Sequence, residues 1–269
     1  MTPRRLERAL DYVILAFFAI TSLTPIVAVF KMSLDSEVIG ESSWGHFENY
    51  AKAWEQGHFS SYMANSIEVA VLVVIAALIL SIMSGYVLGV LRPPGSTALF
   101  YLFLLGIMVP SEAIVIPLFF DLRDLGLTDT IWAIALPQIA QSTAFGTFWM
   151  RSYFRGVDPA IVEAAQLDGA GTARTLWSVL LPMGMPAIVT QIVLTFMWTW
   201  NDFLIPLIMS PSGKFRTAPL GLAFFQGQYT QGTTLLAAGA VLVALPMVIL
   251  YLALQRHFIA GMTEGAVKG

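Results

Sequence analysis

Residues Ile67–Leu91 read IEVAVLVVIAALILSIMSGYVLGVL, and this apolar run decides the fold class. Its only charged residue is Glu68. A helix that crosses the hydrocarbon core of a bilayer needs about 20 mostly apolar residues, whereas a soluble core does not need runs of this length. Lipid offers no partner for an open backbone N–H or C=O group, so the run predicts a membrane-spanning α-helix.

Five further apolar runs bring the expected number of spans to six. The spans cover about residues 12–30, 67–91, 98–120, 131–150, 185–210 and 235–255. Apolar residues make up 57% of the chain and charged residues 12%, and the mean hydropathy is +0.74. We therefore expect an all-α integral membrane protein with one transmembrane domain over residues 1–269. The run after MTPRRLERAL is too long for a signal peptide and lacks a small-residue cleavage site, so it is expected to be a retained first span.

The distribution of Lys and Arg predicts the orientation of the chain. A cytoplasmic N-terminus puts nine of these residues on the cytoplasmic side and five on the other side, as the positive-inside rule requires. The nine are Arg4, Arg5, Arg8, Arg92, Arg151, Arg155, Arg174, Arg256 and Lys268; the five are Lys31, Lys52, Arg123, Lys214 and Arg216. Six spans then make the C-terminus cytoplasmic as well.

Residues 31–66 are then outside, in an acidic and aromatic segment that contains Asp35, Glu37, Glu41, Trp44, Glu48 and Trp54. Such a segment can dock a soluble extracytoplasmic protein. An ordinary solvated loop with interfacial tryptophans explains the composition equally well.

Several function classes are disfavoured by what the sequence lacks. The chain has no cysteine, which excludes a disulfide framework, a Cys-ligated metal site and a thiol nucleophile. The motifs HExxH and GxSxG are absent, so a membrane-embedded hydrolase has little support. The net charge of −3 argues against a nucleic-acid surface. We therefore expect no catalytic residue, metal site or cofactor in this chain.

The polar segment 151–184, between the fourth and fifth expected spans, carries its own local helix signals. Asp158 can cap a helix that starts at Pro159, because proline suits the first helical position. Gly169 is expected to end this helix, and Thr172 to cap the next one. The segment is thus predicted to form two short helices joined at a glycine corner.

The first of these helices contains EAAQLDGA, residues 163–170, and has the features of a docking surface. The small side chains of Ala164 and Ala165 allow close approach, and Glu163 and Asp168 offer charge. The alternative is a helix that lies on the membrane interface. That alternative is weaker, because anionic lipid would repel the acidic side.

The loop resembles the EAA motif of ATP-binding-cassette (ABC) importer permeases, in which EAA is followed by three residues, a glycine and a later Leu-Pro. Glu163, Ala164, Ala165 and Gly169 match it, and Leu181–Pro182 follows at the expected distance. The sequence DGA after the EAA is similar to that of the carbohydrate-type, maltose-permease-like second subunits. Matching stretches are VPSEAIVIPLFF, LGLTDT, WNDFL and QRHFIAGMTEGAVKG. The resemblance covers most of the chain from Asn49 onward, but the first span lacks a strong motif.

The resemblance implies a permease subunit of an ATP-driven, binding-protein-dependent sugar importer in a bacterial inner membrane. Its coupling-helix loop would lie in the cytoplasm between the fourth and fifth of six spans. Implied partners are a second permease subunit in a heterodimer, two ATP-binding subunits and an extracytoplasmic sugar-binding protein, in contact with lipid but not nucleic acid. The implied ATPase-docking residues are Glu163, Ala164, Ala165, Asp168 and Gly169. Because the chain has no G-x-x-x-x-G-K-[ST] motif, ATP and Mg²⁺ would be bound by the partners, and this chain is not expected to be an enzyme.

Polar residues inside the expected spans are candidates for the solute path, because charges at membrane depth are costly and often functional. Glu112 lies in the third span, and Trp198, Trp200, Asn201 and Asp202 lie in the fifth. Aromatic rings with carboxylates and amides suit a polyol. Alternatively, the carboxylates cap broken helices or pair with nearby cations. In the resembled family, the substrate contacts can also come mainly from the partner permease.

Two further patterns concern contacts between helices. The polar cluster in the fourth span is explained by helix-to-helix hydrogen bonds or by a pore; it consists of Gln138, Gln141, Ser142 and Thr143. Gly85 and Gly89 are one turn apart and predict a close approach of two helices. A competing function, a secondary transporter or channel without an ATPase partner, would need paired intramembrane carboxylates or inverted repeats and leaves EAAQLDGA unexplained.

Overall fold

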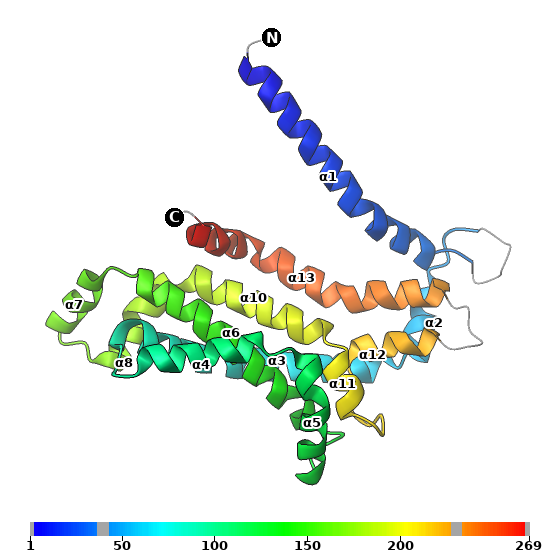
Figure 1. Ribbon diagram of the computed structural model, residues 1–269. Helices are drawn as coiled ribbons and strands as arrows, with labels where there is room; N and C mark the ends of the chain where they lie inside the picture. Colours follow the sequence, from blue (N-terminus) through cyan, green and yellow to red (C-terminus); the bar gives the residue numbers. More distant parts are fainter. Residues whose placement is uncertain (1–2, 37–42, 227–232, 267–269) are drawn as a thin grey trace. The chain divides into compact units, whose positions relative to one another are not determined.

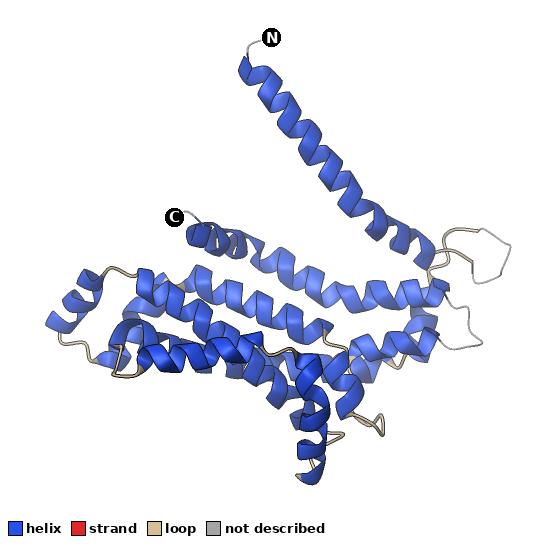
Figure 2. Cartoon of the chain, viewed as in Figure 1, coloured by secondary structure: helices blue, strands red, loops and turns tan. Residues whose placement is uncertain are grey.

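The computed structural model describes residues 3–36, 43–226 and 233–266, and this part of the chain is almost entirely helical (Figures 1 and 2). The exception to helix and loop is an isolated antiparallel bridge between Asp35 and Trp44. Glu37 and Glu41 of the expected outer segment lie outside the described residues. The all-α fold class predicted from the apolar runs is confirmed.

The helices follow one another along the chain with short connections. The long ones are α1 (Pro3–Ser33), α3 (Phe59–Tyr86), α4 (Ser96–Met108), α5 (Ser111–Asp124), α6 (Ile131–Gly156), α10 (Met185–Asn201) and α13 (Thr233–Ala266). The short ones are α2 (Glu48–Gln56), α7 (Pro159–Leu167), α8 (Thr172–Arg174), α9 (Leu181–Met183), α11 (Leu204–Met209) and α12 (Ala218–Leu222). Two π-type segments, η1 (Val87–Leu91) and η2 (Thr175–Leu180), and the 3₁₀ turn η3 (Ala223–Gln226) complete the set.

Contacts within the chain group the residues into two compact units. One unit contains residues 1–60 and 221–245, and the other contains residues 61–220 and 246–269. In the first unit, the ring of Phe59 packs against that of Phe225, and a Cβ atom added at Gly239 would touch Phe59. The second unit, which holds the polar segment 151–184 and the candidate path residues, is described next.

Three helices in the described part of the chain are long and apolar enough to cross a membrane. They are Glu7–Ser33 in α1, Phe59–Leu91 in α3 and η1, and Thr233–Arg256 in α13. They contain the residues of the expected first, second and sixth spans, and their length and apolar composition agree with these three predictions. The count rises to five if each of two sharply bent helix pairs is one span.

The third expected span, residues 98–120, is wrong as a continuous helix. The chain breaks at Val109–Pro110, and α4 and α5 meet at 94°. Val109 is extended, with φ −77° and ψ 119°, as favoured by the following proline, whose ring disfavours the helical conformation of the residue before it. Pro110 also lacks the N–H that would continue the helical hydrogen bonds. A hydropathy window averages across such a break and does not detect it.

The fifth expected span, residues 185–210, is also wrong as a continuous helix. Helix α10 ends at Asn201, and Asp202 is extended, with φ −66° and ψ 123°. The Asp202 carboxylate accepts a hydrogen bond from the backbone N–H of Ile205 at 3.3 Å, which starts α11. An Asp side chain thus offers the backbone an alternative to a continued helix.

The fourth expected span corresponds to α6, which has 26 residues but is not among the candidate spans. Its polar residues lower its hydropathy; they include Gln138, Gln141, Ser142, Thr143 and Thr147. Most of them are wholly or partly buried inside the unit. A helix shielded by its neighbours does not need a uniformly apolar surface. The count of six spans therefore stays a prediction.

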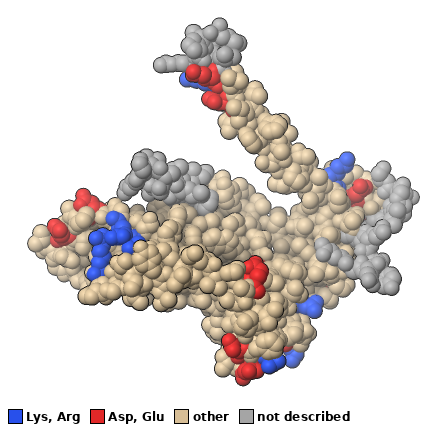
Figure 3. All heavy atoms as spheres, viewed as in Figure 1, with Lys and Arg blue, Asp and Glu red and all other residues tan. Residues whose placement is uncertain are grey.

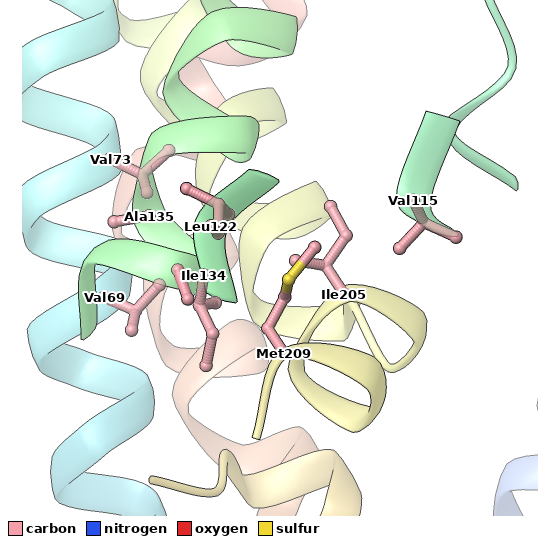
Figure 4. Close-up of a cluster of buried hydrophobic side chains, with 9 residues drawn as sticks. Val69, Val73, Val115, Leu122, Ile134, Ala135, Ile205 and Met209 are labelled. Atoms are coloured by element: carbon pink, nitrogen blue, oxygen red, sulfur yellow. The ribbon is translucent and has the colours of Figure 1, made fainter. Parts of the chain in front are cut away.

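One apolar core joins α3, α5, α6 and α11 (Figure 4). Its buried members are Val69, Val73, Val115, Leu122, Ala133, Ile134, Ala135, Ile205 and Met209. A second core joins the ends of α3 and α6 to η2 and α10, and is formed by Ile82, Tyr86, Met150, Phe154, Leu176, Leu180, Leu181 and Ile188. The second core supports the loop segment from inside.

The predicted close approach at Gly85 and Gly89 is confirmed. A Cβ atom added at Gly85 would lie 2.7 Å from the Cβ atom of Met150 and 2.9 Å from the backbone N of Arg151. At Gly89 it would lie 2.9 Å from the Cβ atom of Phe154. The two glycines therefore let the end of α3 and the segment η1 pack directly on α6.

The expected loop LGLTDT is tied to the loop after α11 by Asp129. Its backbone N–H donates to Met209 O at 2.9 Å, and its Oδ1 accepts from Ser210 Oγ and Ser212 N, both at 3.0 Å. Burial alone would raise the pKa of Asp129, but the hydrogen bonds from Ser212 and Ser210 outweigh it and lower the pKa below its ordinary value. The two loops are thus joined by charge-assisted hydrogen bonds.

Candidate functional site

Two neighbourhoods contain the residues singled out from the sequence: the loop around α7, and a cavity beside the α4–α5 break. At the start of α7, Asp158 Oδ1 accepts a hydrogen bond from the backbone N–H of Ala160 at 3.0 Å, and Pro159 is the first helical residue. This helix start agrees with the prediction. The predicted capping role of Thr172 is wrong, because Gly171 precedes α8 and no side-chain cap is formed there.

The end of α7 is a left-handed glycine turn. The N–H of Gly169 donates to Gln166 O at 3.0 Å, and the N–H of Ala170 donates to Ala165 O at 2.9 Å. This pair of bonds is the Schellman arrangement, which requires a residue with positive φ after the helix. Gly169 has φ +79°, so the turn uses a conformation that glycine adopts without strain.

Four of the five expected docking residues are exposed on this helix and turn: Glu163, Ala164, Asp168 and Gly169. Ala165 is only 8% exposed, so its small side chain serves packing within this chain, and α7 packs on η2. The prediction that Ala165 belongs to the outer surface is therefore not supported by its burial.

The structure adds an apolar residue to the same surface. Leu167 is 89% exposed, although it lies between Gln166 and Asp168 in a polar turn. An isolated exposed leucine is common, but one at the tip of an acidic, capped helix gives that helix an apolar contact point. Figure 3 shows Asp and Glu atoms at the α7 end of the visible face. Sequence reasoning overlooked Leu167, because it counted only charged and small residues in the motif.

A cavity of about 440 Å³ lies beside the α4–α5 break, between α6 and the end of α10. Three expected path residues line it: Glu112, Trp198 and Asp202. Asn201 does not, because its amide folds back and donates to Met197 O at 2.8 Å. Glu112 and Asp202, both candidates for the path from the sequence, therefore line one cavity although they are distant in the chain.

Asp202 connects the cavity to the surrounding helices. Its Oδ2 accepts a hydrogen bond from Gln138 Nε2 at 2.7 Å, while its Oδ1 receives the Ile205 N–H. The bond from Ile205 agrees with the alternative that the Asp202 carboxylate binds backbone N–H groups at a broken helix, although Phe203 is the residue that precedes α11; Asp202 also lines the cavity. Neither ion pair found among the described residues involves Asp202, so the alternative of pairing with a nearby cation is not observed for it.

The two tryptophans of the expected path lie in different surroundings. Trp198 lines the cavity, and its ring makes an edge contact with Phe145 at 4.7 Å between centroids. Trp200 is 1% exposed and stacks on Phe196, so its proposed place in the path is wrong. Residues two apart on a helix face different directions, and packing of α10 decides which one meets the cavity.

The polar cluster of the fourth span contributes to the same cavity. Gln138, Gln141 and Ser142 line the cavity, whereas Thr143 is not part of the lining. Among the described residues, Gln138 Oε1 and Thr199 Oγ1 are buried lining atoms with no hydrogen-bond partner. A buried polar group without a partner is costly, so the cavity is suited to water or to a hydroxylated solute. No group of three or more potential metal ligands occurs in the described part of the chain.

Comparison with known proteins identifies the family. The family model "binding-protein-dependent transport system inner membrane component" matches residues 77–264. The probable ABC transporter permease protein YurM of Bacillus subtilis is 34% identical over 249 residues, covering 91% of this chain and 82% of YurM. The trehalose transport system permease protein SugB of Mycobacterium tuberculosis is 33% identical over 257 residues, covering 92% and 93%.

A solved structure agrees with this result. A bacterial ABC transporter involved in the import of the acidic polysaccharide alginate matches with a TM-score of 0.75 and 25% identity, covering 96% of this chain and 98% of the matched chain. The resemblance drawn from EAAQLDGA is thereby confirmed at the level of the family, and the secondary-transporter alternative gains no support. The chain belongs to the binding-protein-dependent transport system inner membrane components, which are ABC importer permeases that work with ATPase and binding-protein partners.

Proposed function

We propose that this chain is one of two permease subunits of a sugar importer, and that α7 with its glycine turn couples it to the ATPase. The observation that carries the coupling role is the exposure of Glu163, Leu167 and Asp168 on a capped helix with a Schellman turn. A sugar as solute is supported by the similarity to the trehalose permease SugB. ATP turnover moves the permease only if the ATPase binds two permease conformations unequally.

The docking surface consists of Glu163, Ala164, Asp168 and Gly169, with Leu167 as its apolar centre and Ala165 supporting it from below. An acidic rim around an exposed leucine fits a cleft with an apolar floor and basic walls. The proposed complex contains a second, non-identical permease subunit, two ATP-binding subunits that hold ATP and Mg²⁺, and an extracytoplasmic sugar-binding protein. The chain forms a single permease domain with both termini in the cytoplasm.

The solute path is proposed to include the cavity beside the α4–α5 break. Its carboxylates, amides and the Trp198 ring are the groups that bind sugars through hydrogen bonds and stacking. The unpartnered Gln138 Oε1 and Thr199 Oγ1 can accept hydrogen bonds from solute hydroxyls. The breaks between α4 and α5 and between α10 and α11 both border this cavity. Backbone groups freed at the breaks can be hydrated there, as irregular backbone at membrane depth requires.

Affinity purification tests the assembly directly. The tagged full-length chain, solubilised from its native membrane, should retain two ATP-binding subunits and one second permease chain, and the complex should hydrolyse ATP. Glu163→Lys should release the ATP-binding protein but not the second permease, because it reverses one exposed charge of the docking surface. Purification of the unchanged chain without an ATP-binding protein, under conditions that keep the two permeases together, would contradict the assembly.

Asp202→Ala is expected to lower uptake at least tenfold without loss of the ATPase partner. Alanine removes the acceptor for Gln138 and for the Ile205 N–H, which leaves buried donors unpaired at a cost of about 1–3 kcal/mol each. Asp202→Asn retains one carbonyl oxygen and should show a smaller loss. Asn201→Ala is the matched control, because Asn201 is exposed and does not line the cavity. Uptake assays with equal membrane levels distinguish the three, and full activity of Asp202→Ala would make Asp202 dispensable for the path.

A further inference from the structure

Three arginines from two segments of the chain lie near the end of α6. Arg151 and Arg155 lie one turn apart in α6, and Arg92 directly follows η1, which packs on α6. The positive charges of Arg155 and Arg92 repel that of Arg151. Arg92 Nε donates to Gly89 O at 2.7 Å, and the Arg151 guanidinium lies over the ring of Phe100 in α4, 3.6 Å from its centroid. Figure 3 shows Lys and Arg atoms gathered toward the α7 end of the visible face.

This arginine cluster takes part in no ion pair within the described residues. The two ion pairs found there are His46–Glu48 and Arg123–Asp124, and neither involves the cluster. Arg151 Nε is buried and has no hydrogen-bond partner. Burial, followed by the charges of Arg155 and Arg92, lowers the pKa of Arg151, but a guanidinium stays protonated in proteins. The C-terminal end of α6 offers only a partial charge of about −0.5 against three full positive charges.

The surface next to the arginine cluster is apolar. Helix α4 starts four residues after Arg92 and has no buried residue. Its outward residues Leu99, Tyr101, Leu102 and Leu105 are 49%, 61%, 64% and 57% exposed. The structure therefore places three cations at the end of an exposed apolar helix. A soluble anion would neutralise only the arginines, and an apolar partner would cover only the exposed side chains of α4.

We propose that Arg92, Arg151 and Arg155 bind the phosphate headgroup of an anionic phospholipid whose acyl chains lie along α4. Guanidinium groups bind phosphate oxygens through paired, charge-assisted hydrogen bonds, and Arg151 is already oriented by its contact with Phe100. Basic pockets at the cytoplasmic end of membrane helices bind anionic headgroups in this way. With the proposed orientation, the arginine cluster lies at the inner leaflet.

Native mass spectrometry of the purified full-length chain tests the site. The chain in detergent is incubated with dioleoyl phosphatidylglycerol or with dioleoyl phosphatidylcholine, and bound lipid is counted for each. We expect at least tenfold better retention of phosphatidylglycerol, since each basic residue near an anionic lipid contributes roughly a fivefold factor. The triple change Arg92→Gln, Arg151→Gln and Arg155→Gln should remove this preference. Inorganic phosphate at equal concentration should not displace the lipid, because it lacks the acyl chains.

Two variants keep the result interpretable. The double change Arg92→Gln with Arg155→Gln leaves the packed Arg151 in place and should lower the preference by at least fivefold even if the triple variant does not fold. Arg123→Gln removes an exposed arginine that pairs with Asp124 outside the arginine cluster, and should keep the full preference. Unchanged retention in the double variant would overturn the proposal. The proposal would also be overturned if the double variant lost the ATP-binding protein but bound lipid as before. That result would assign the arginine cluster to a protein contact.

Discussion

Gly169→Pro is expected to reduce ATP-driven uptake to background while the chain still inserts into the membrane. Proline fixes φ near −65°, whereas Gly169 has φ +79°, and proline also lacks the N–H that Gly169 donates to Gln166 O. Both hydrogen bonds of the Schellman turn depend on this residue. The turn orients Asp168 and Leu167, so its loss should abolish docking. Uptake of the cognate sugar in whole cells, with the membrane level of the chain measured in parallel, gives the result.

Gly171→Ala is the matched control for the glycine turn. Gly171 has φ −70°, and an added Cβ atom at either glycine would meet no atom within 4 Å. The two positions therefore differ in backbone conformation and not in available space. Glu163→Lys is a second test of the same docking surface, because it reverses an exposed charge without disturbing the turn. It should also abolish uptake. Normal uptake in both Gly169→Pro and Glu163→Lys would rule out the coupling role of α7.

Gly85→Leu is expected to prevent stable folding of the second unit. Even the first atom of the new side chain would lie 2.7 Å from Met150 Cβ, 2.9 Å from Arg151 N and 3.0 Å from Met150 C. Two of these are backbone atoms of α6, which cannot move without moving the helix. Overpacking a core typically costs about 1–3 kcal/mol, and a clash with backbone lies at or above the upper end of that range. The midpoint of thermal unfolding in detergent, and the yield of monodisperse protein, measure the effect.

Gly106→Ala shows whether glycine loss by itself matters. Gly106 also lies within a helix, but its added Cβ atom would meet only Ala144 Cβ at 3.4 Å, an ordinary contact. Alanine should therefore be tolerated there, with a gain of up to about 1 kcal/mol in helix propensity. Gly85→Ala should be clearly less stable than Gly106→Ala. Equal unfolding midpoints for these two alanine variants would contradict the close approach of α3 and α6.

Local chemistry was enough to predict the parts of segment 151–184 that depend on neighbouring residues. The start of α7 depends on Asp158 and Pro159, residue types that favour the cap and the first position of a helix. Its end depends on the positive φ of Gly169. The capping role of Thr172 was wrong because Gly171 takes the position before the helix, a difference of one residue. The exposure of Leu167 and the burial of Ala165 required knowledge of which side of α7 packs on η2.

The cavity, in contrast, depends on contacts between residues that are distant in the chain. Glu112, Gln138 and Asp202 are distant in the chain, and only the packing of α5, α6 and α10 brings them to one cavity. The same packing separates Trp198 from Trp200.

The membrane class and the family thus follow from the amino-acid sequence, because hydropathy and helix capping depend on residues within a few turns of one helix. The broken spans, the cavity and the pairing of Gln138 with Asp202 follow from tertiary structure, because each depends on contacts between helices that are far apart in the chain.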